Sequence, residues 1–321
     1  MAVRKYSISV VVPVYNEEKN ILPFYQRTIA VMKQLKCNYE IIFSLDPCTD
    51  GTEDVILDLR KTDKSVKLLK FSRRFGQPAA TLAGIHYSTS DACVVIDVDL
   101  QDPPELIIDM VEKWQEGYHV AYAQRISRKG ETIIKKIVSA VGYWVINKIS
   151  DVKIPRNTGD FRLMSREVVE KLKELKESHG FLRGLVGLVG FSQVAIPYER
   201  DARFAGDTNY NRFLGSLTIG FNGIVSFSRY PLQIISLVGF IISIFSFLIG
   251  TTYVVLRLFH VEVLWGNPTT VILISFLSGI QLLSMGVMGE YLGRIYDEVK
   301  QRPLYFVQDA HGFSPARGKH K

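Results

Sequence analysis

Two closely spaced carboxylates follow a short apolar run in the first third of the chain. Asp97 and Asp99 are one residue apart and come directly after residues 94–96, which are Val, Val and Ile. The run predicts a buried strand, and the carboxyl ends of central strands are where open α/β sheets bind ligands. Two carboxylates favour a hard divalent cation, which in turn binds phosphate oxygens. The alternative is a solvated turn after the strand. Asp102 and Pro103 next predict a helix start, with Asp102 as the N-cap.

The first 125 residues alternate between strand and helix patterns. Besides the strand before Asp97, strands are expected at residues 8–12, 39–45, 66–71 and 119–123. Helices are expected up to residue 35, at 52–60, at 78–87 and up to residue 114. The first strand is expected to end in a turn at Pro13. This alternation predicts an α/β domain with a parallel sheet that is covered on both faces.

Further polar groups are expected at the same edge of the sheet. Residues 12–18 and 45–52 bring acidic side chains to the ends of the first and second strands. These side chains could accept hydrogen bonds from a base or a ribose, or could serve only as N-caps and turns. The basic run at residues 72–77 could face a phosphate or be solvated. The chain has no P-loop and no G-x-G-x-x-G motif, which disfavours ATPases and dinucleotide-binding enzymes.

Several of these motifs, in this order, resemble the family 2 glycosyltransferases of GT-A (Rossmann-like) fold. The resemblance is strongest to the polyisoprenyl-phosphate branch, which includes dolichol-phosphate mannose synthases and bactoprenol glucosyltransferases. It rests on Pro-Val-Tyr-Asn-Glu at 13–17, Arg-Arg-Phe-Gly-Gln at 73–77, Asp-Val-Asp-Leu-Gln-Asp-Pro at 97–103, and the segments 156–164, 203–210 and 289–294. One departure is Leu45, where the family often has the first Asp of a pair.

The resemblance implies a binding site for a nucleotide sugar. The residues that would surround the nucleobase and ribose are Pro13, Tyr15, Glu17 and Asp46. Those that would hold a Mg²⁺ or Mn²⁺ ion on the diphosphate are Asp97, Asp99 and Gln101. Arg203, on a loop that contains glycine, would close over the diphosphate, although a surface Arg near a membrane is the alternative. A metal ion and an Arg would both stabilise the departing nucleoside diphosphate.

An acceptor site is expected in the segment that follows. Residues 125–149 have the pattern of a basic, partly apolar helix, on which Lys135 and Ser139 share one face. Together with Arg125 they resemble the family's site for the acceptor lipid phosphate, although such a helix could also be merely solvated. Asp160 is expected in a turn between elements. The resemblance places it near the reacting centre, while a turn-forming Asp is the alternative.

The last third of the chain has the pattern of a membrane anchor. Residues 211–229 predict an amphipathic helix on the membrane surface. Residues 231–256 and 264–289 carry no charge and are long enough to span a bilayer. Lys and Arg flank this pair of helices on its outer sides, which predicts that both termini are cytoplasmic. The expected organisation is a GT-A domain at 1–210, a juxtamembrane helix at 211–230, a transmembrane hairpin at 231–292 and a cytoplasmic tail at 293–321.

These features together predict an enzyme of the bacterial inner membrane. The resemblance implies that it would transfer a hexose with inversion to a polyisoprenyl (undecaprenyl) phosphate. UDP-glucose is the favoured donor, ahead of UDP-galactose, UDP-N-acetylglucosamine or a GDP-sugar. The net charge of +7 suits a phosphorylated substrate or an anionic membrane, whereas scattered basic residues disfavour nucleic acid. Four-residue spacings of small residues, such as Gly289 and Gly293, together with the resemblance, favour a homo-oligomer. The alternatives are a processive polysaccharide synthase, which should carry a Gln-x-x-Arg-Trp motif, and a non-enzymatic nucleotide-sugar sensor or lipid-carrier transporter.

Overall fold

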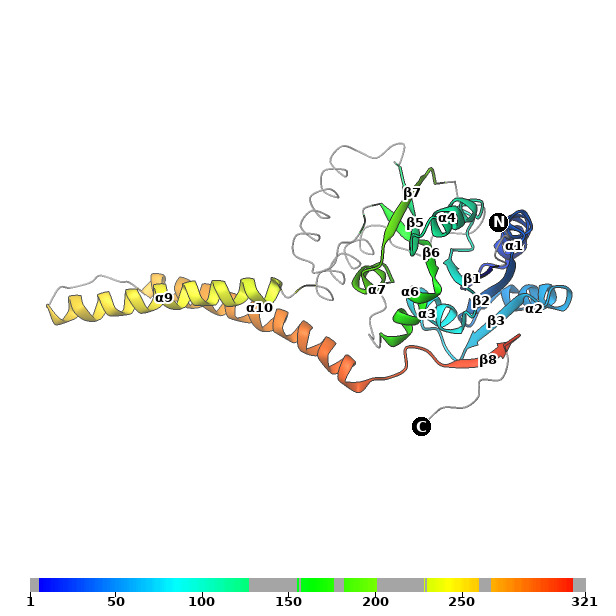
Figure 1. The fold of residues 1–321 in the computed structure, drawn as a ribbon. Helices are drawn as coiled ribbons and strands as arrows, with labels where there is room; N and C mark the ends of the chain where they lie inside the picture. Colours follow the sequence, from blue (N-terminus) through cyan, green and yellow to red (C-terminus); the bar gives the residue numbers. More distant parts are fainter. Residues whose placement is uncertain are drawn as a thin grey trace.

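A mixed eight-stranded sheet forms the centre of the larger domain (Figure 1). The computed structural model describes residues 6–126, 155, 157–175, 182–200, 228, 230–259 and 267–313. The strand order is β7-β5-β6-β4-β1-β2-β3-β8. The strands are β1 (Ser7–Val14), β2 (Asn38–Leu45), β3 (Val66–Phe71), β4 (Ala92–Val95), β5 (Val120–Arg125), β6 (Thr158–Ser165), β7 (Gln193–Tyr198) and β8 (Val307–His311).

The five predicted strands run in the same direction, as expected, but two further strands run against them. β1 pairs in parallel with β2 and with β4, β2 with β3, and β5 with β7. β6 instead runs antiparallel to both β4 and β5, and β8 runs antiparallel to β3. Parallel neighbours need a long crossover, usually a helix, and the regular alternation of strands and helices predicts only that kind of connection. β6 follows a long intervening segment, and β8 follows the second of the two long C-terminal helices.

Helices cover both faces of the sheet, as expected. One layer contains α1 (Glu18–Leu35), α2 (Thr52–Thr62) and α4 (Leu106–Gln115), and the other contains α3 (Gln77–Tyr87), α6 (Arg166–Glu174) and α7 (Leu182–Val189). Alternate residues of the buried strands point into these two layers: Val10 and Val12 into the first, Val11 into the second. Helix α3 lies close on β1, because a side chain at Gly84 would meet Val11 Cγ1 at 2.3 Å.

One expected turn and one expected helix start differ from the structure. Pro13 does not form a turn: it lies buried inside β1, in register with Ser44 of β2, and the chain turns only after Val14. Asp102 is not an N-cap, because α4 begins at Leu106 and Glu105 occupies the N-cap position. In both places contacts with distant segments outweigh the local preference of Pro and Asp-Pro for turns and helix starts.

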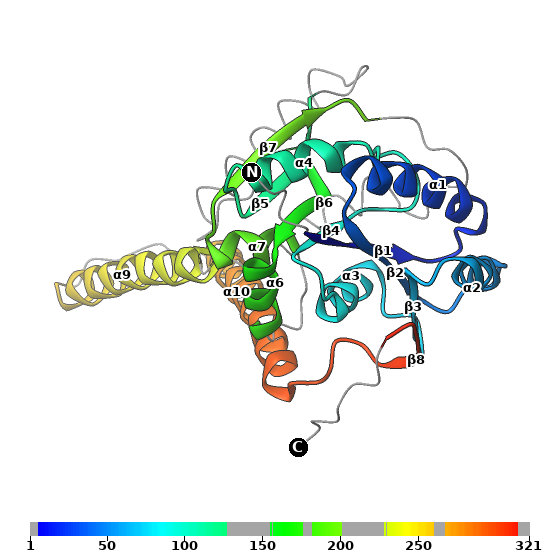
Figure 2. The ribbon, with the colours of Figure 1, turned by 45° about the vertical axis from the view of Figure 1, so that its right-hand side comes forward.

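Two long apolar helices project away from the sheet side by side (Figures 1 and 2). They are α9 (Tyr230–Leu258) and α10 (Asn267–Lys300), and their candidate spans have mean hydropathies of 2.5 and 1.8. Neither span is buried within the molecule. Apolar surface left in water costs about 25 cal/mol per Å², so these helices associate the protein with a membrane. The predicted pair of apolar helices is present as two candidate spans, although α10 extends beyond residue 292. The predicted helix at 211–229 lies outside the described residues.

Candidate active site

The strand ends predicted to carry the chemistry meet at one edge of the sheet. The carboxyl ends of β1, β2, β4, β5 and β7 lie there because these strands run in the same direction. The amino end of β6 lies there too, since β6 is antiparallel to its neighbours. The expectation that Asp160 lies in a turn is therefore wrong. Asp160 lies in the first half of strand β6. The antiparallel strand is what brings Asp160 to the same edge as Asp97.

The loops after β1 and β2 are joined by hydrogen bonds. Asn16, with a left-handed φ of 54°, donates from Nδ2 to Thr49 Oγ1 over 3.1 Å, and its Oδ1 accepts from the Thr49 amide over 2.9 Å. The Glu17 amide donates to Thr52 Oγ1 over 2.9 Å. Beside them the Arg74 guanidinium lies 3.8 Å from the centre of the Tyr15 ring. These contacts fix Tyr15 and Glu17 at the sheet edge, where sequence predicts a nucleobase and ribose.

Asp46 holds the loop at residues 72–77. Its side chain is 2% exposed, and its two oxygens accept hydrogen bonds from the amides of Phe75 and Gly76, each over 2.9 Å. Gly76 has a φ of +89°, which glycine adopts without strain. The neighbouring Leu45 is fully buried in the core, so this position offers no second carboxylate. Asp46 thus links the end of β2 to the basic run that begins at Arg73.

Negative charge gathers after β4. Asp97 Oδ1 accepts a hydrogen bond from Gln77 Nε2 over 2.8 Å, and Asp99 Oδ1 accepts one from the amide of Gln101 over 3.1 Å. Burial, together with the nearby carboxylates of Asp160, Asp99 and Asp102, raises the pKa of Asp97 to about 7, against the opposing effect of a nearby Arg. The carboxylates of this group therefore repel one another.

Asp102 forms a buried network between distant strands. It is 2% exposed, and its Oδ1 accepts a short hydrogen bond from the Tyr198 hydroxyl. Arg200 Nε lies 3.4 Å from the same oxygen, and Arg125 Nη2 lies 3.8 Å from the other. Arg125 Nε also donates to the Tyr198 oxygen over 3.2 Å. Burial and the Asp102 carboxylate raise the pKa of Tyr198 to about 12. The network places Arg125 at this edge of the sheet, close to Gly159.

Asp160 lies between two cations. Arg183 Nε of α7 donates to Asp160 Oδ1 over 3.0 Å. Arg162, two residues further along β6, is 3% exposed and donates from Nη2 to the Gly159 carbonyl over 3.0 Å. Burial lowers the pKa of Arg162 to about 10, although the nearby Asp160 carboxylate opposes this shift. Asp160 is therefore held in place by an ion pair from a separate element.

The structure brings most of the predicted residues together. Pro13, Tyr15, Glu17, Asp46, Asp97, Asp99, Gln101, Arg125 and Asp160 all lie along this edge. Lys135, Ser139 and Arg203 lie outside the described residues. Sequence reasoning missed the parts played by Gln77 and Arg162, although both stand within quoted motifs. It also missed the contacts of Tyr198 and Arg183, which only the pairing of distant elements reveals.

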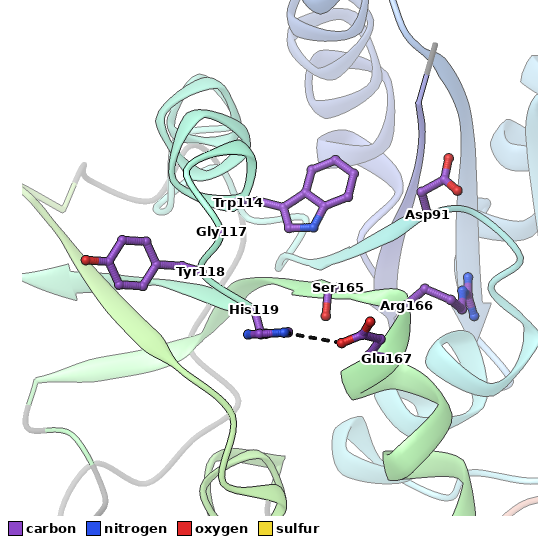
Figure 3. A pocket seen from close by; sticks show the side chains of 8 residues that line it. All are labelled: Asp91, Trp114, Gly117, Tyr118, His119, Ser165, Arg166 and Glu167. Atoms are coloured by element: carbon purple, nitrogen blue, oxygen red, sulfur yellow. Dashed lines mark ion pairs between the residues drawn. The ribbon is translucent and has the colours of Figure 1, made fainter. Parts of the chain in front are cut away.

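The cavity drawn in Figure 3 is separate from the candidate active site. Its volume is about 310 Å³, and it lies at the opposite edge of the sheet, where Ser165 is in register with Ala92 at the amino end of β4. Two of the polar side chains that line it have protein partners: His119 Nε2 lies 3.2 Å from Glu167, and Arg166 donates to the carbonyls of Ser88 and Ser90. None of the predicted site residues lines this cavity.

Comparison with known proteins identifies the family. Residues 9–173, which include the edge from Tyr15 to Asp160, match glycosyl transferase family 2. The chain belongs to this family. It is a glycosyltransferase of GT-A fold, as the sequence motifs predict. The prediction of a non-enzymatic sensor or transporter as an alternative loses its basis.

The relatives of this glycosyltransferase match it along nearly its whole length. The uncharacterized glycosyltransferase YkcC of Bacillus subtilis is 46% identical over 98% of this chain and 97% of its own. The SfII prophage-derived bactoprenol glucosyl transferase of Shigella flexneri is 41% identical over 96% of this chain and 99% of its own. A prophage bactoprenol glucosyl transferase homolog of Escherichia coli is 40% identical over 94% and 98%. The similarity therefore includes the two apolar helices as well as the family 2 domain.

The carboxylates of Asp97 and Asp99 offer oxygen ligands of the kind that a hard divalent cation binds. Asp97 and Asp99 are partly exposed, and their mutual repulsion with Asp160 is what a cation would relieve. No three His, Cys, Asp or Glu side chains among the described residues are arranged to hold a metal alone. Oxygen atoms of a bound diphosphate would complete the coordination, as is usual for Mg²⁺.

Proposed function

We propose that this glycosyltransferase transfers glucose from UDP-glucose to undecaprenyl phosphate at the cytoplasmic face of the bacterial inner membrane. The observation that carries the proposal is the 41% identity, over 96% of the chain, to a protein named bactoprenol glucosyl transferase. The two candidate membrane spans agree with a lipid acceptor. We term the edge of the sheet where the carboxyl ends of β1, β2 and β4 lie the carboxyl edge. Its carboxylates and cations agree with a phosphorylated donor and a phosphorylated acceptor.

The donor binds, in this proposal, across the ends of β1, β2 and β4. Tyr15, Glu17 and Asp46 line the position of the nucleobase and ribose, and Pro13 shapes the end of β1. Asp97, Asp99 and Gln101 would hold Mg²⁺ or Mn²⁺, which would supply the positive charge that the leaving diphosphate needs. Arg203 adds a further positive charge on the diphosphate.

The acceptor phosphate binds Arg125, Lys135 and Ser139. Its second ionisation is near pH 6, by analogy with phosphorylated side chains, so it arrives as a nucleophile without help from a general base. A phosphate oxygen attacks C1 of glucose while the bond from C1 to the diphosphate oxygen breaks, and UDP leaves with that electron pair. Attack from the face opposite the diphosphate inverts the configuration at C1. Asp160, fixed by Arg183, orients the acceptor.

A donor panel tests the proposal. The full-length protein in detergent is given undecaprenyl phosphate, Mn²⁺ and one of UDP-glucose, UDP-galactose, UDP-N-acetylglucosamine or GDP-mannose. We expect one sugar per lipid, fastest from UDP-glucose, with inverted configuration at C1. A polysaccharide product would favour the processive synthase, and a faster reaction with another donor would correct the sugar.

The proposed orientation has its own test. A cysteine at Asn267, at the start of α10, should react with an impermeant maleimide from outside intact cells. A cysteine at Lys319 should react only after permeabilisation. The reverse result would place the catalytic domain on the side that lacks nucleotide sugars, and the proposed function would fail with it.

A further inference from the structure

The chain returns to the catalytic domain after the second apolar helix. Residues 304–313, which we term the strap, follow α10 and run alongside β3, at the lateral side of the sheet (Figures 1 and 2). Within the strap, β8 pairs antiparallel with β3, from Leu68 opposite His311 to Phe71 opposite Val307. Tyr305 packs on Phe71 with ring centres 5.9 Å apart. The strap is therefore a part of the catalytic domain's sheet.

The strap contacts the loop that carries the basic run, residues 72–77, which we term the donor loop. The amide of Ser72 donates to the Phe306 carbonyl over 3.1 Å. The rings of Phe306 and Phe75 lie 6.1 Å apart, and the Arg73 guanidinium is 4.1 Å from the centre of the Phe75 ring. Phe75 is thus held between the strap, Arg73 and strand β3.

The donor loop also contacts the predicted donor site. Asp46 accepts the amides of Phe75 and Gly76, and Gln77 donates to Asp97. Phe75 is therefore the residue that touches the strap with its side chain and Asp46 with its amide. A shift of the Phe75 ring would move the amides bound to Asp46 and the residue after them, Gln77. This places Phe306 two contacts away from Asp46.

We propose that Phe306 is a positioning residue for donor binding, and that the strap acts on the donor site through Phe75. Phe306 holds Phe75, and Phe75 holds the donor loop against Asp46 and Asp97. The chain beyond the membrane helices thereby determines how well the nucleotide sugar binds, although it does not touch the sugar. This inference rests on the proposed function for the identity of the donor, but its structural step does not.

The strap provides a matched control. Phe313 is an aromatic residue of the same segment, but its ring packs on Tyr87 at 5.2 Å and lies beneath the Lys67 ammonium at 5.0 Å. Within the described part of the chain, neither of these ring contacts involves the donor loop. Phe306 is 54% exposed, so its truncation removes little from the core. Phe306→Ala and Phe313→Ala therefore separate an effect on the donor loop from a general weakening of the strap.

Two measurements on the full-length protein in detergent test the proposal. In Phe306→Ala, hydrogen exchange should accelerate in the donor loop, and the KM for UDP-glucose should rise by about threefold to tenfold, as expected for one lost aromatic pair. The KM for the lipid should stay unchanged, and Phe306→Tyr should restore both readouts. Phe313→Ala should change neither the donor-loop exchange nor the donor KM.

The outcomes distinguish this inference from the proposed function. Equal donor-loop exchange in Phe306→Ala and Phe313→Ala would overturn the positioning role of Phe306, whatever the donor. An equal rise of the donor and lipid KM values would overturn it as well, since it would indicate a general defect. If the wild type used another donor, the proposed function would be corrected. The KM comparison would then be made with that donor.

Discussion

Carboxylates near the two ends of strand β4 have different surroundings. At the amino end, Asp91 accepts hydrogen bonds from the amide and the hydroxyl of Ser7 over 2.8 and 2.7 Å. Near this end the buried Glu40 accepts from Lys67, Ser9 and Thr89. At the carboxyl end, Asp97 accepts one hydrogen bond from Gln77 and faces three other carboxylates.

The pKa values follow this difference. Burial alone would raise the pKa of Glu40, but hydrogen bonds from Lys67, Ser9 and Thr89 outweigh it, and the pKa is lowered. Hydrogen bonding to Ser7 lowers the pKa of Asp91. Burial and neighbouring carboxylates raise that of Asp97 to about 7. At the amino end the protein's own donors offset the burial of the carboxylates, whereas at the carboxyl end a positively charged ligand would relieve the repulsion around Asp97.

The largest effect is expected at the carboxyl end. Asp99→Asn should lower turnover by about 10²-fold or more, on the order of 3 kcal/mol, because the leaving diphosphate loses its counter-charge. Steady-state rates with saturating donor and lipid measure this. EDTA should abolish wild-type activity, and Mn²⁺ or Mg²⁺ should restore it.

The stability of the same variant sharpens the comparison. Removing one of several repelling carboxylates should leave the unfolding temperature unchanged or raised. A variant that lost activity and stability together would show that Asp99 supports the fold, as the carboxylates at the other end do. Full wild-type activity in EDTA would contradict the assignment of a metal ion to Asp97 and Asp99.

Glu40→Gln should show the opposite behaviour. It leaves Lys67 without its buried partner and should lower the free energy of unfolding by about 2–3 kcal/mol, while kcat remains within error of the wild type. The pKa of Glu40 is lower in the folded state, so its stabilisation is present above the unfolded-state pKa and is lost as the pH falls through the folded-state pKa. Urea titrations at pH 7 and in acid should show the gap between variant and wild type narrowing in acid.

A smaller effect is expected for the acceptor side of the carboxyl edge. Arg125→Lys keeps the positive charge but loses the fork that contacts Tyr198 and Asp102. We expect the KM for undecaprenyl phosphate to rise by about tenfold, or 1.4 kcal/mol, and the KM for the donor to stay constant. Tyr198→Phe is the control, since it disturbs the network without removing the cation. A rise in the donor KM alone would assign Arg125 to the other substrate.

The smallest effect is expected for Asp91→Asn. Asp91 is exposed, so losing its charge-assisted hydrogen bonds to Ser7 should cost about 0.5–1 kcal/mol of stability and no activity. Urea titration at pH 7 measures this. A change in donor or lipid KM would contradict the separation between the two ends of β4.

Sequence predicts the carboxyl edge well because its signals are local. An apolar run followed by Asp97 and Asp99 indicates a strand end, and four parallel strands bring such ends together. The position of Asp160 depends instead on β6 running antiparallel, which no local pattern indicates. The Asp102-Pro103 pair shows the same limit, because it favours a helix start locally. A tyrosine almost a hundred residues later determines its actual role.

The location of β8 has a consequence for biosynthesis. A ribosome completes β1 to β7 before it makes α9 and α10, and it makes β8 only after both. Until then β3 is an open edge strand, and such edges pair readily with other chains. The N-terminal domain therefore has an unpaired edge strand, β3, during the time in which the two apolar helices enter the bilayer. Nascent chains stalled before residue 304 should accordingly depend more on chaperones than the finished protein.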